Sequence, residues 1–394
     1  MNIDYLYGLL GLSFWGYFFV AVASVQITVL CVTIYLHRDA AHRAVDLHPA
    51  LRHFARFWIW FTAGMLTREW VAVHRKHHAK CETPDDPHSP VIFGLRKVLL
   101  EGAELYQLQA RDAQVQEKYG RGTPDDWIER NLYTKHRNWG VLAIVVLDLL
   151  LFGVPGIIII AVQMLAMPLL AAGVINGVGH HSGYRNFECP DAATNISPWG
   201  LVLGGEELHN NHHAFPSSAK FSVRPWEFDM GWLWIKLFSA LGLAKVRRVA
   251  PTPIEHPERK HIDLDTVRAV IQNRMNVLRD YARQVMLPVC RHEFQQAGAR
   301  LTGRVKKLLI REPVLLDDSA QGALRQVLAR HQALNAVYEA RERLQQIWNG
   351  RTLSNDLLVS QLQEWIARAE ASGIHSLEQF AARLRRFVLQ PTSA

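Results

Sequence analysis

Histidines are frequent in this chain and are concentrated in one part of it. Fourteen of the 19 histidines lie between His37 and His213. Three short groups and one single residue stand out among them: His37 and His42; His74, His77 and His78; His180; and His209, His212 and His213. Imidazole nitrogens are good ligands for Zn, Cu, Fe and Ni. The nine histidines are therefore candidate metal ligands.

Two of these groups have the spacing His-x-x-His-His, at residues 74–78 and 209–213. Positions i, i+3 and i+4 share one face of a helix, so each group can present three ring nitrogens to metal. His37 and His42 are five residues apart and do not share a helical face. The helix must therefore end or distort between them, or the two residues bind different ions.

The number of candidate ligands sets the expected number of metals. A catalytic zinc takes three protein ligands and a structural zinc takes four, so nine imidazoles indicate two metals. Iron is the redox-active metal that best suits an all-imidazole pair of sites in a reducing compartment, although the spacing alone also allows zinc. Asn176 precedes His180 by one helical turn. It could reach a metal through water or pack as an amide between helices.

The four cysteines point away from sulfur-based sites. They are far apart and form no Cys-x-x-Cys pair. This excludes a disulfide scaffold, an iron–sulfur cluster and a zinc ribbon, and it fits a reduced cytoplasmic compartment.

Long uncharged runs predict helices that span a membrane. Residues 5–36 carry no charge, whereas a crossing takes about 20 residues. They form either one long helix or a tight hairpin. Residues 139–179 contain a single charge, Asp148, and a Gly-Val-Pro-Gly turn signal near the middle. We expect two further spans, at 139–157 and 158–179.

The distribution of Lys and Arg predicts the orientation. No basic residue precedes Arg38, while residues 37–138 contain sixteen. The positive-inside rule places this segment in the cytoplasm, and two further crossings return residue 180 to the same side. All four histidine groups then face the cytoplasm from a multi-pass protein of the cytoplasmic membrane.

The composition changes near residue 250. Prolines at 251, 253 and 257 mark a linker, after which helical periodicity takes over. Residues 245–394 contain 24 Lys and Arg against 15 Asp and Glu, a net charge of +9. The charges are scattered along amphipathic helices, without a DNA-binding motif. We expect this surface to face anionic lipid or an acidic electron donor, and no nucleic acid.

Together these patterns predict an all-α protein. Residues 1–250 form an integral membrane helical bundle with a cytoplasmic cap that carries the histidine groups. Residues 251–394 form a basic, soluble helical domain.

The sequence resembles the membrane-bound fatty acid desaturases, in particular the bacterial relatives of the stearoyl-CoA desaturases. The resemblance covers about residues 15–250. Besides the histidines, its motifs are Glu69-Trp70, Glu82-Thr83, Asp86-Pro87-His88, Asn176-x-x-x-His180 and Gly205-Glu206-x-x-His209-Asn210-x-His212-His213-Ala214-Phe215-Pro216. The N-terminal arm departs from four-helix relatives, because it has one clear apolar segment where they have two.

The resemblance implies a di-iron enzyme that uses O2 and two electrons to convert a saturated acyl chain into a cis-monounsaturated one. The expected position is the 9,10 bond of a C16 or C18 chain, carried by CoA or by a phospholipid in the membrane. The nine histidines are the implied ligands, with Asn176 touching one iron through water. No catalytic residue is expected beyond these ligands.

Two further features complete the expected site. The ring nitrogens that do not bind metal need partners that fix their tautomers, and Glu206 and Asp39 are candidates. Simple surface exposure is the competing interpretation of these two residues. The chain has no dinucleotide, ferredoxin or haem motif. Electrons must therefore come from a separate ferredoxin or a flavin or iron–sulfur reductase.

Three rival functions remain open from the sequence. A di-iron alkane or lipid hydroxylase uses similar histidine groups, although Asn210-x-His212-His213-Ala214-Phe215-Pro216 favours desaturation. A membrane metal transporter or sensor would place its ligands at mid-membrane, whereas here they lie outside the apolar runs. A zinc hydrolase needs fewer histidines and a catalytic Glu, as in His-Glu-x-x-His, which the groups lack.

Overall fold

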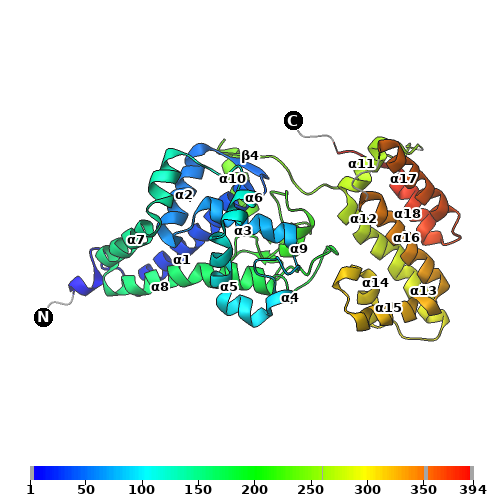
Figure 1. Ribbon diagram of the computed structural model, residues 1–394, viewed down its shortest axis with the longest axis horizontal. Helices are drawn as coiled ribbons and strands as arrows, with labels where there is room; N and C mark the ends of the chain where they lie inside the picture. Colours follow the sequence, from blue (N-terminus) through cyan, green and yellow to red (C-terminus); the bar gives the residue numbers. More distant parts are fainter. Residues whose placement is uncertain (1–3, 260, 350–353, 391–394) are drawn as a thin grey trace. The chain divides into compact units, whose positions relative to one another are not determined.

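The computed structural model describes residues 4–259, 261–349 and 354–390, and these are mostly helical (Figure 1). The chain divides into two compact units. Unit 1 comprises Met1–Arg185 and Asp191–Ala250, and unit 2 comprises Asn186–Pro190 and Pro251–Ala394. Among the described residues, strands form only three two-stranded sheets. The expectation of a predominantly helical protein is met.

Unit 1 consists of helices joined by short strands and loops. The helices are η1 (Asp4–Tyr7), α1 (Phe14–Leu30), η2 (Cys31–Ala41), α2 (Pro49–Ala63), α3 (Thr67–Lys80), α4 (Pro90–Phe93), α5 (Leu95–Ala110), α6 (Ala113–Tyr119), η3 (Glu129–Thr134), α7 (Arg137–Phe152), α8 (Val154–Met167), η4 (Pro168–Val178), α9 (His209–Ala214) and α10 (Met230–Ala240). The strands are β1 (Val45–Leu47), β2 (Trp199–Gly200), β3 (Phe228–Asp229) and β4 (Ala244–Val246). β1 pairs with β4 antiparallel, and β2 pairs with β3 in parallel.

Two helices in the described chain are long and apolar enough to cross a membrane, by length and composition. α1 and η2 form one continuous helix, Phe14–Ala41, and α8 and η4 form another, Val154–Val178. Only 17% of the most apolar window of the second helix is buried. A core helix of a soluble protein would hide most of its surface. An exposed apolar helix of this length instead favours contact with lipid.

The structure changes two details of the predicted spans. The segment expected at 5–36 contains one long helix, not a hairpin, and this helix begins at Phe14 and continues to Ala41. The spans expected to meet at residue 157 meet instead at Gly153, where the chain turns with a φ of 62°. A Cβ on Gly153 would lie 2.1 Å from the Leu6 carbonyl oxygen, so the close approach requires glycine.

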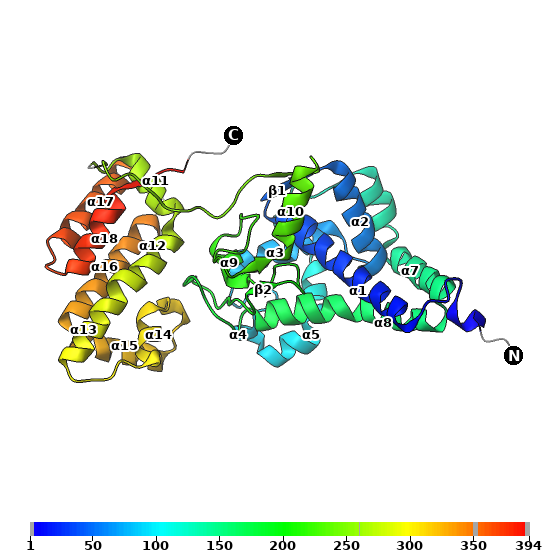
Figure 2. The ribbon, with the colours of Figure 1, turned by 180° about the vertical axis from the view of Figure 1, so that it is seen from behind.

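The apolar helices and the histidine-bearing helices lie at opposite ends of unit 1. In both views, α1, α7 and α8 run together towards the N-terminal tip, while α3 and α9 lie at the other end (Figures 1 and 2). α5 packs closely along η4. A Cβ on Gly102 of α5 would lie 2.7 Å from the Ala172 carbonyl oxygen. This close packing fixes the helix that leads to His180.

Unit 2 is a compact helical domain. Its elements are β5 (Ile254–Glu255), α11 (Leu264–Gln272), α12 (Arg274–Tyr281), η5 (Ala282–Met286), α13 (Leu287–Gln296), α14 (Gly303–Ile310), η6 (Pro313–Leu315), α15 (Asp318–Arg330), α16 (Gln332–Asn349), α17 (Asn355–Glu370), α18 (His375–Arg385) and β6 (Phe387–Val388). β5 and β6 pair antiparallel. At its core, the Tyr281 hydroxyl donates to the Val337 carbonyl at 2.6 Å, and the Tyr281 ring packs against Phe380.

The short segment Asn186–Pro190 belongs to unit 2, although it lies far from the rest of that unit in sequence. Phe187 is buried beneath the Arg279 guanidinium, 5.5 Å from it, and Glu188 forms an ion pair with Arg311 at 3.7 Å. No sequence pattern predicted this insertion, because residues 186–190 lie between His180 and His209 in the histidine-bearing region.

Candidate metal centre and its cavity

A π-helical segment brings the first two histidines together. In η2, the His42 amide donates to the His37 carbonyl at 3.0 Å, a bond that spans five residues where an α-helix spans four. The wider turn places residues i and i+5 near one another, and the two rings lie 5.0 Å apart. Of the alternatives that the spacing left open, the structure therefore shows distortion of the helix.

The two His-x-x-His-His groups lie on α3 and α9, as the spacing predicts. However, neither group directs all three rings to one point. The nine rings gather into two clusters. Cluster A contains His37, His42, His74, His78 and His212. Cluster B contains His77, His180, His209 and His213. On α3, His74 and His78 belong to cluster A and His77 belongs to cluster B. On α9, His212 belongs to cluster A, whereas the other two histidines belong to cluster B.

In both clusters the Nε2 atoms converge. In cluster A, the Nε2 atom of His212 lies 3.0 Å from that of His37 and 2.9 Å from that of His78. His42 and His74 bring theirs within 2.8 Å. In cluster B, the Nε2 atom of His180 lies 3.2 Å from that of His77 and 3.0 Å from that of His209.

Four carboxylates determine which ring nitrogens carry protons. Glu206 lies 2.7 Å from His37 Nδ1, and Asp86 lies 3.0 Å from His77 Nδ1. Further contacts join Glu82 to His180 Nδ1 at 3.0 Å and Asp191 to His213 Nδ1 at 3.1 Å. A carboxylate only accepts hydrogen bonds, so each of these Nδ1 atoms is the donor and the Nε2 atom of the same neutral ring presents a lone pair. Such partners are typical of metal-binding histidines.

Converging lone pairs repel one another unless a cation lies between them. Burial and the neighbouring His37 and His78 hold the pKa of His74 well below its usual value, so this ring stays neutral and able to bind metal. His213 Nε2 is buried and has no hydrogen-bond partner among the described residues. The donor set, all imidazole with carboxylates behind it, therefore fits a pair of transition-metal ions.

The expected supporting residues have different environments in the structure. Glu206 orients His37, as noted above. Asp39, by contrast, pairs with Arg52 through two contacts of 2.7 Å instead of meeting an imidazole. Asn176 lines the cavity described below.

Sequence reasoning missed three carboxylates at this site, whereas His88 was considered as a possible supporting residue and not as a ligand. Glu82, Asp86 and Asp191 were not predicted to hold histidines, although the first two belong to motifs that follow the second group. His88 stacks on His77 at 4.5 Å, and neither of its ring nitrogens has a hydrogen-bond partner in the part of the chain that the structure describes. The Cys81 sulfur lies 3.8 Å from His77 Nε2. For Cys81 and Glu82, the available signal was their position three and four residues after His78, whereas Asp191 lies 11 residues after His180 and offered no such signal.

An apolar cavity of about 220 Å³ opens beside the clusters. His74, His77 and His209 line it at one end, and Asn176 lies in the same wall. Apolar side chains from several helices form much of the remaining wall: Val32, Met65, Met164, Met167, Ala171 and Ile175. A narrow apolar space that reaches clustered imidazoles can bring an inert hydrocarbon segment to a metal while excluding water.

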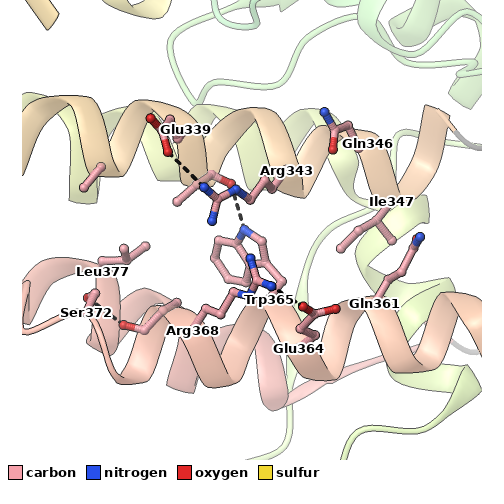
Figure 3. A pocket seen from close by; sticks show the side chains of 13 residues that line it. Glu339, Arg343, Gln346, Ile347, Gln361, Glu364, Trp365, Arg368, Ser372 and Leu377 are labelled. Carbon is pink, nitrogen blue, oxygen red and sulfur yellow. Dashed lines mark hydrogen bonds and ion pairs between the residues drawn. The ribbon is translucent and has the colours of Figure 1, made fainter. Parts of the chain in front are cut away.

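A second concave region lies in unit 2, between α16 and α17, with a volume of about 390 Å³. Figure 3 shows its charged side chains paired along each helix: Arg343 with Glu339 at 2.9 Å and Arg368 with Glu364 at 2.5 Å. The Trp365 indole donates to the Ala340 carbonyl. These groups satisfy one another and form no metal-binding set. The histidine clusters are therefore the better candidate for chemistry.

The comparisons with known proteins divide the chain at the same place. The family model described as "Fatty acid desaturase" matches residues 12–244. A model described as "Transposase" matches residues 263–390, about a third of the chain, where the sequence analysis identified no motif. The second match contains none of the nine histidines and does not make the chain a transposase.

Three relatives illustrate the first match. "sn-1 stearoyl-lipid 9-desaturase" of Synechocystis sp. is 31% identical over 56% of this chain and 68% of its own length. "Acyl-CoA C20 Delta5-desaturase" of Anemone leveillei is 30% identical over 58% of this chain and 73% of its own. "Probable lipid desaturase ADS3.2, chloroplastic" of Arabidopsis thaliana is 29% identical over 58% of this chain, which spans 63% of that relative's length. With more than half of its residues matched by the family model, the chain belongs to the fatty acid desaturase family, whose members are oxidoreductases that desaturate acyl chains.

Proposed function

We propose that this protein desaturates a saturated C16 or C18 acyl chain at the 9,10 position, with O2 as co-substrate and two iron ions held by the nine histidines. One observation carries the proposal: two clusters of convergent imidazole nitrogens lie at the end of an apolar cavity. Two redox-active irons would supply the oxidising power to remove two hydrogens from adjacent methylenes, with O2 and two electrons yielding water.

The protein's own residues position the reacting groups. Glu206, Asp86, Glu82 and Asp191 hold four ligand rings in one tautomer, so that Nε2 faces the metal. The cavity walls exclude water and align the chain, so that only particular methylenes reach the clusters. No group outside the ligand set needs to transfer a proton to or from the saturated chain, and we assign no further catalytic residue.

The division of the nine histidines into two clusters supports one ion at each cluster. Cluster A offers five histidines, and cluster B offers four, with Asn176 in the adjacent cavity wall. We propose that Asn176 contacts the ion of cluster B through a water molecule. The amide is neutral and binds transition metals less well than imidazole does, and its place in the cavity wall leaves room for a bridging water molecule.

The carrier and the bond position follow from relatives rather than from the geometry. One similar protein is named for stearoyl-lipid and the 9 position, and another for acyl-CoA and the Δ5 position. Both carriers present a chain at a membrane surface. We propose acyl-CoA or a membrane phospholipid as substrate and the 9,10 bond as the position.

We further propose a multi-pass protein of the cytoplasmic membrane whose clusters face the cytoplasm. The two long apolar helices and the concentration of Lys and Arg in residues 37–138 support this orientation. A cytoplasmic site would be accessible to a soluble ferredoxin or reductase. Such a donor is required, because the sequence has no redox-cofactor motif of its own.

The decisive experiment is expression in a host supplied with deuterated palmitate and stearate, followed by gas chromatography with mass detection. The wild-type chain is expected to yield a labelled cis-9 monoene, and His77→Ala is expected to yield none. His136→Ala is the matched control, because the His136 ring lies in a tilted arrangement 5.0 Å from Trp139 and belongs to neither cluster, and it should leave the product unchanged. A labelled hydroxy acid would show that the protein hydroxylates the acyl chain and does not desaturate it. No product from iron-loaded wild type with a reductase present would contradict the proposal.

A further inference from the structure

The far end of the apolar cavity is polar. Gln163 and Thr62 line the cavity there, and two further hydroxyl residues contact them. Gln163 Nε2 donates to Ser24 Oγ at 2.9 Å, and the hydroxyls of Thr28 and Thr62 lie 3.3 Å apart. We call these four residues the polar floor. Its hydroxyl and amide groups contrast with the methionine, alanine and isoleucine side chains of the wall.

The polar floor lies far from the histidine clusters. Gln163 precedes Asn176 by 13 residues on the continuous helix Val154–Val178. At about 1.5 Å per residue, these two cavity-lining positions are separated by about 20 Å along the helix axis. Gln163 is also the first residue of this helix that lines the cavity. A chain that enters from the cluster end therefore meets the polar floor last.

The Gln163 amide is only partly hydrogen-bonded. The residue is 7% exposed, and its Oε1 atom has no hydrogen-bond partner among the described residues. Rotating the amide by 180° does not remove the problem, because the oxygen would then face Ser24 and the NH2 group would be unpaired. In either orientation, one polar group of the Gln163 amide lacks a partner among the described residues, in a side chain that lines the cavity.

The hydroxyls of the polar floor are already used. Ser24 donates to the Ala21 carbonyl at 3.2 Å, and Thr62 donates to the Trp58 carbonyl at 2.7 Å. Thr28 donates to the Ser24 carbonyl at 2.9 Å and accepts from the Trp58 indole. They have no donor left for Gln163. A water molecule can supply the missing hydrogen bond, whereas the methyl end of an acyl chain cannot.

We propose that Gln163 is a residue that sets chain length, because its amide holds a water molecule at the polar floor. This inference rests on the proposed desaturase function. A longer acyl chain would have to displace the water and cover the amide with hydrocarbon, leaving a buried polar group unpaired. The polar floor therefore selects against chains that extend beyond it.

The test is Gln163→Leu in the full-length protein, with equal amounts of deuterated palmitate and stearate supplied. Leucine has a similar length but cannot hold water, so the space becomes available to methylenes. We expect the ratio of C18 to C16 monoene to rise about fourfold or more, the factor for one extra buried methylene. Val162→Leu is the matched control, because Val162 adjoins Gln163 on the same helix but is exposed and does not line the cavity, and it should leave the ratio unchanged.

The outcomes separate the two proposals. A monoene with the wild-type C18 to C16 ratio in Gln163→Leu would overturn the role of Gln163 and leave desaturation intact. No monoene from the wild type would overturn both. If Gln163→Leu does not accumulate, Gln163→Met decides the question, because methionine matches glutamine in length but has no amide to hold water. Its ratio should rise in the same direction, and an unchanged ratio would refute the inference.

Discussion

Single carboxylates determine whether an imidazole in this protein can act as a ligand. His37 depends on Glu206, which is buried and contacts it from 169 positions further along the chain. Without a partner at Nδ1, the ring could protonate either nitrogen and rotate. A residue that never touches the metal therefore sets the direction of the lone pair that would bind it.

Glu206→Gln should weaken metal binding in cluster A. The amide keeps the shape but no longer fixes the proton on His37 Nδ1, and loss of such a partner typically costs about 10- to 100-fold in metal affinity or activity. Metal content during titration with a chelator measures the effect. Asp39→Asn is the matched control, because Asp39 pairs with Arg52 rather than with an imidazole. Equal metal loss from both variants would contradict the role given to Glu206.

The buried histidines also predict a pH dependence. His74 has a lowered pKa in the folded protein, whereas an unfolded histidine binds a proton near pH 6.5. As the pH falls through about 6.5, the unfolded state therefore gains protons that folded His74 does not, and the free energy of unfolding of the metal-free protein decreases. Melting temperatures in detergent between about pH 8 and pH 5.5 measure this. A constant melting temperature across this range would refute it.

At the scale of secondary structure, the π-helical segment η2 is what allows His37 and His42 to act together. An α-helix of the same sequence would turn His42 about 140° away from His37, since each residue advances by about 100°. The extra residue in the turn removes most of this offset. π-helical turns commonly occur at functional sites for this reason, since they re-aim one side chain without ending the helix.

Deleting Ala40 should convert the five-residue spacing of His37 and His42 into a four-residue one and remove the need for the wide turn. The loop after His42 would then be pulled out of register, and we expect cluster A to lose metal while cluster B keeps it. The iron-to-protein ratio should fall from two towards one. Ala40→Ser keeps the register and should retain both ions. Full occupancy in the deletion variant would show that the π-helical turn is dispensable.

Local periodicity predicted the helices that carry residues 74–78 and 209–213, because the i, i+3, i+4 spacing is a property of a single helix. It did not predict that each helix divides its rings between two clusters, since that depends on how α3 and α9 face one another. The partners of His180 and His213, Glu82 and Asp191, also depend on tertiary packing. Likewise, the spacing of His37 and His42 did not predict that Asp39 pairs with Arg52.

At the scale of the whole molecule, the two units are joined by more than the linker near residue 250. Segment Asn186–Pro190 is part of unit 2 but is followed at once by Asp191, which holds His213 of cluster B. Phe187 and Cys189 are each 1% exposed. Unit 2 therefore includes a buried segment that is continuous in the chain with Asp191, a residue of unit 1.

Removing residues 251–394 should expose Cys189. In the whole chain, the burial of Cys189 should make its alkylation slow. In the truncated chain, the same thiol should be alkylated as fast as an exposed thiol. Peptide mass spectrometry after maleimide labelling reports each cysteine separately. Cys31, buried in unit 1, is the internal control and should stay protected in both forms. Continued protection of Cys189 in the truncated chain would contradict the assignment of its segment to unit 2.

The insertion of Asn186–Pro190 into unit 2 also has a consequence for synthesis on the ribosome. Phe187 emerges 92 residues before Arg279, the side chain that covers it. At a translation rate of about 5–20 residues per second, this aromatic ring waits roughly 5 to 18 seconds for its partner. During that interval the Phe187 ring lacks the side chain that covers it in the folded protein. The segment can therefore reach its final packing only after residue 279 has been synthesised.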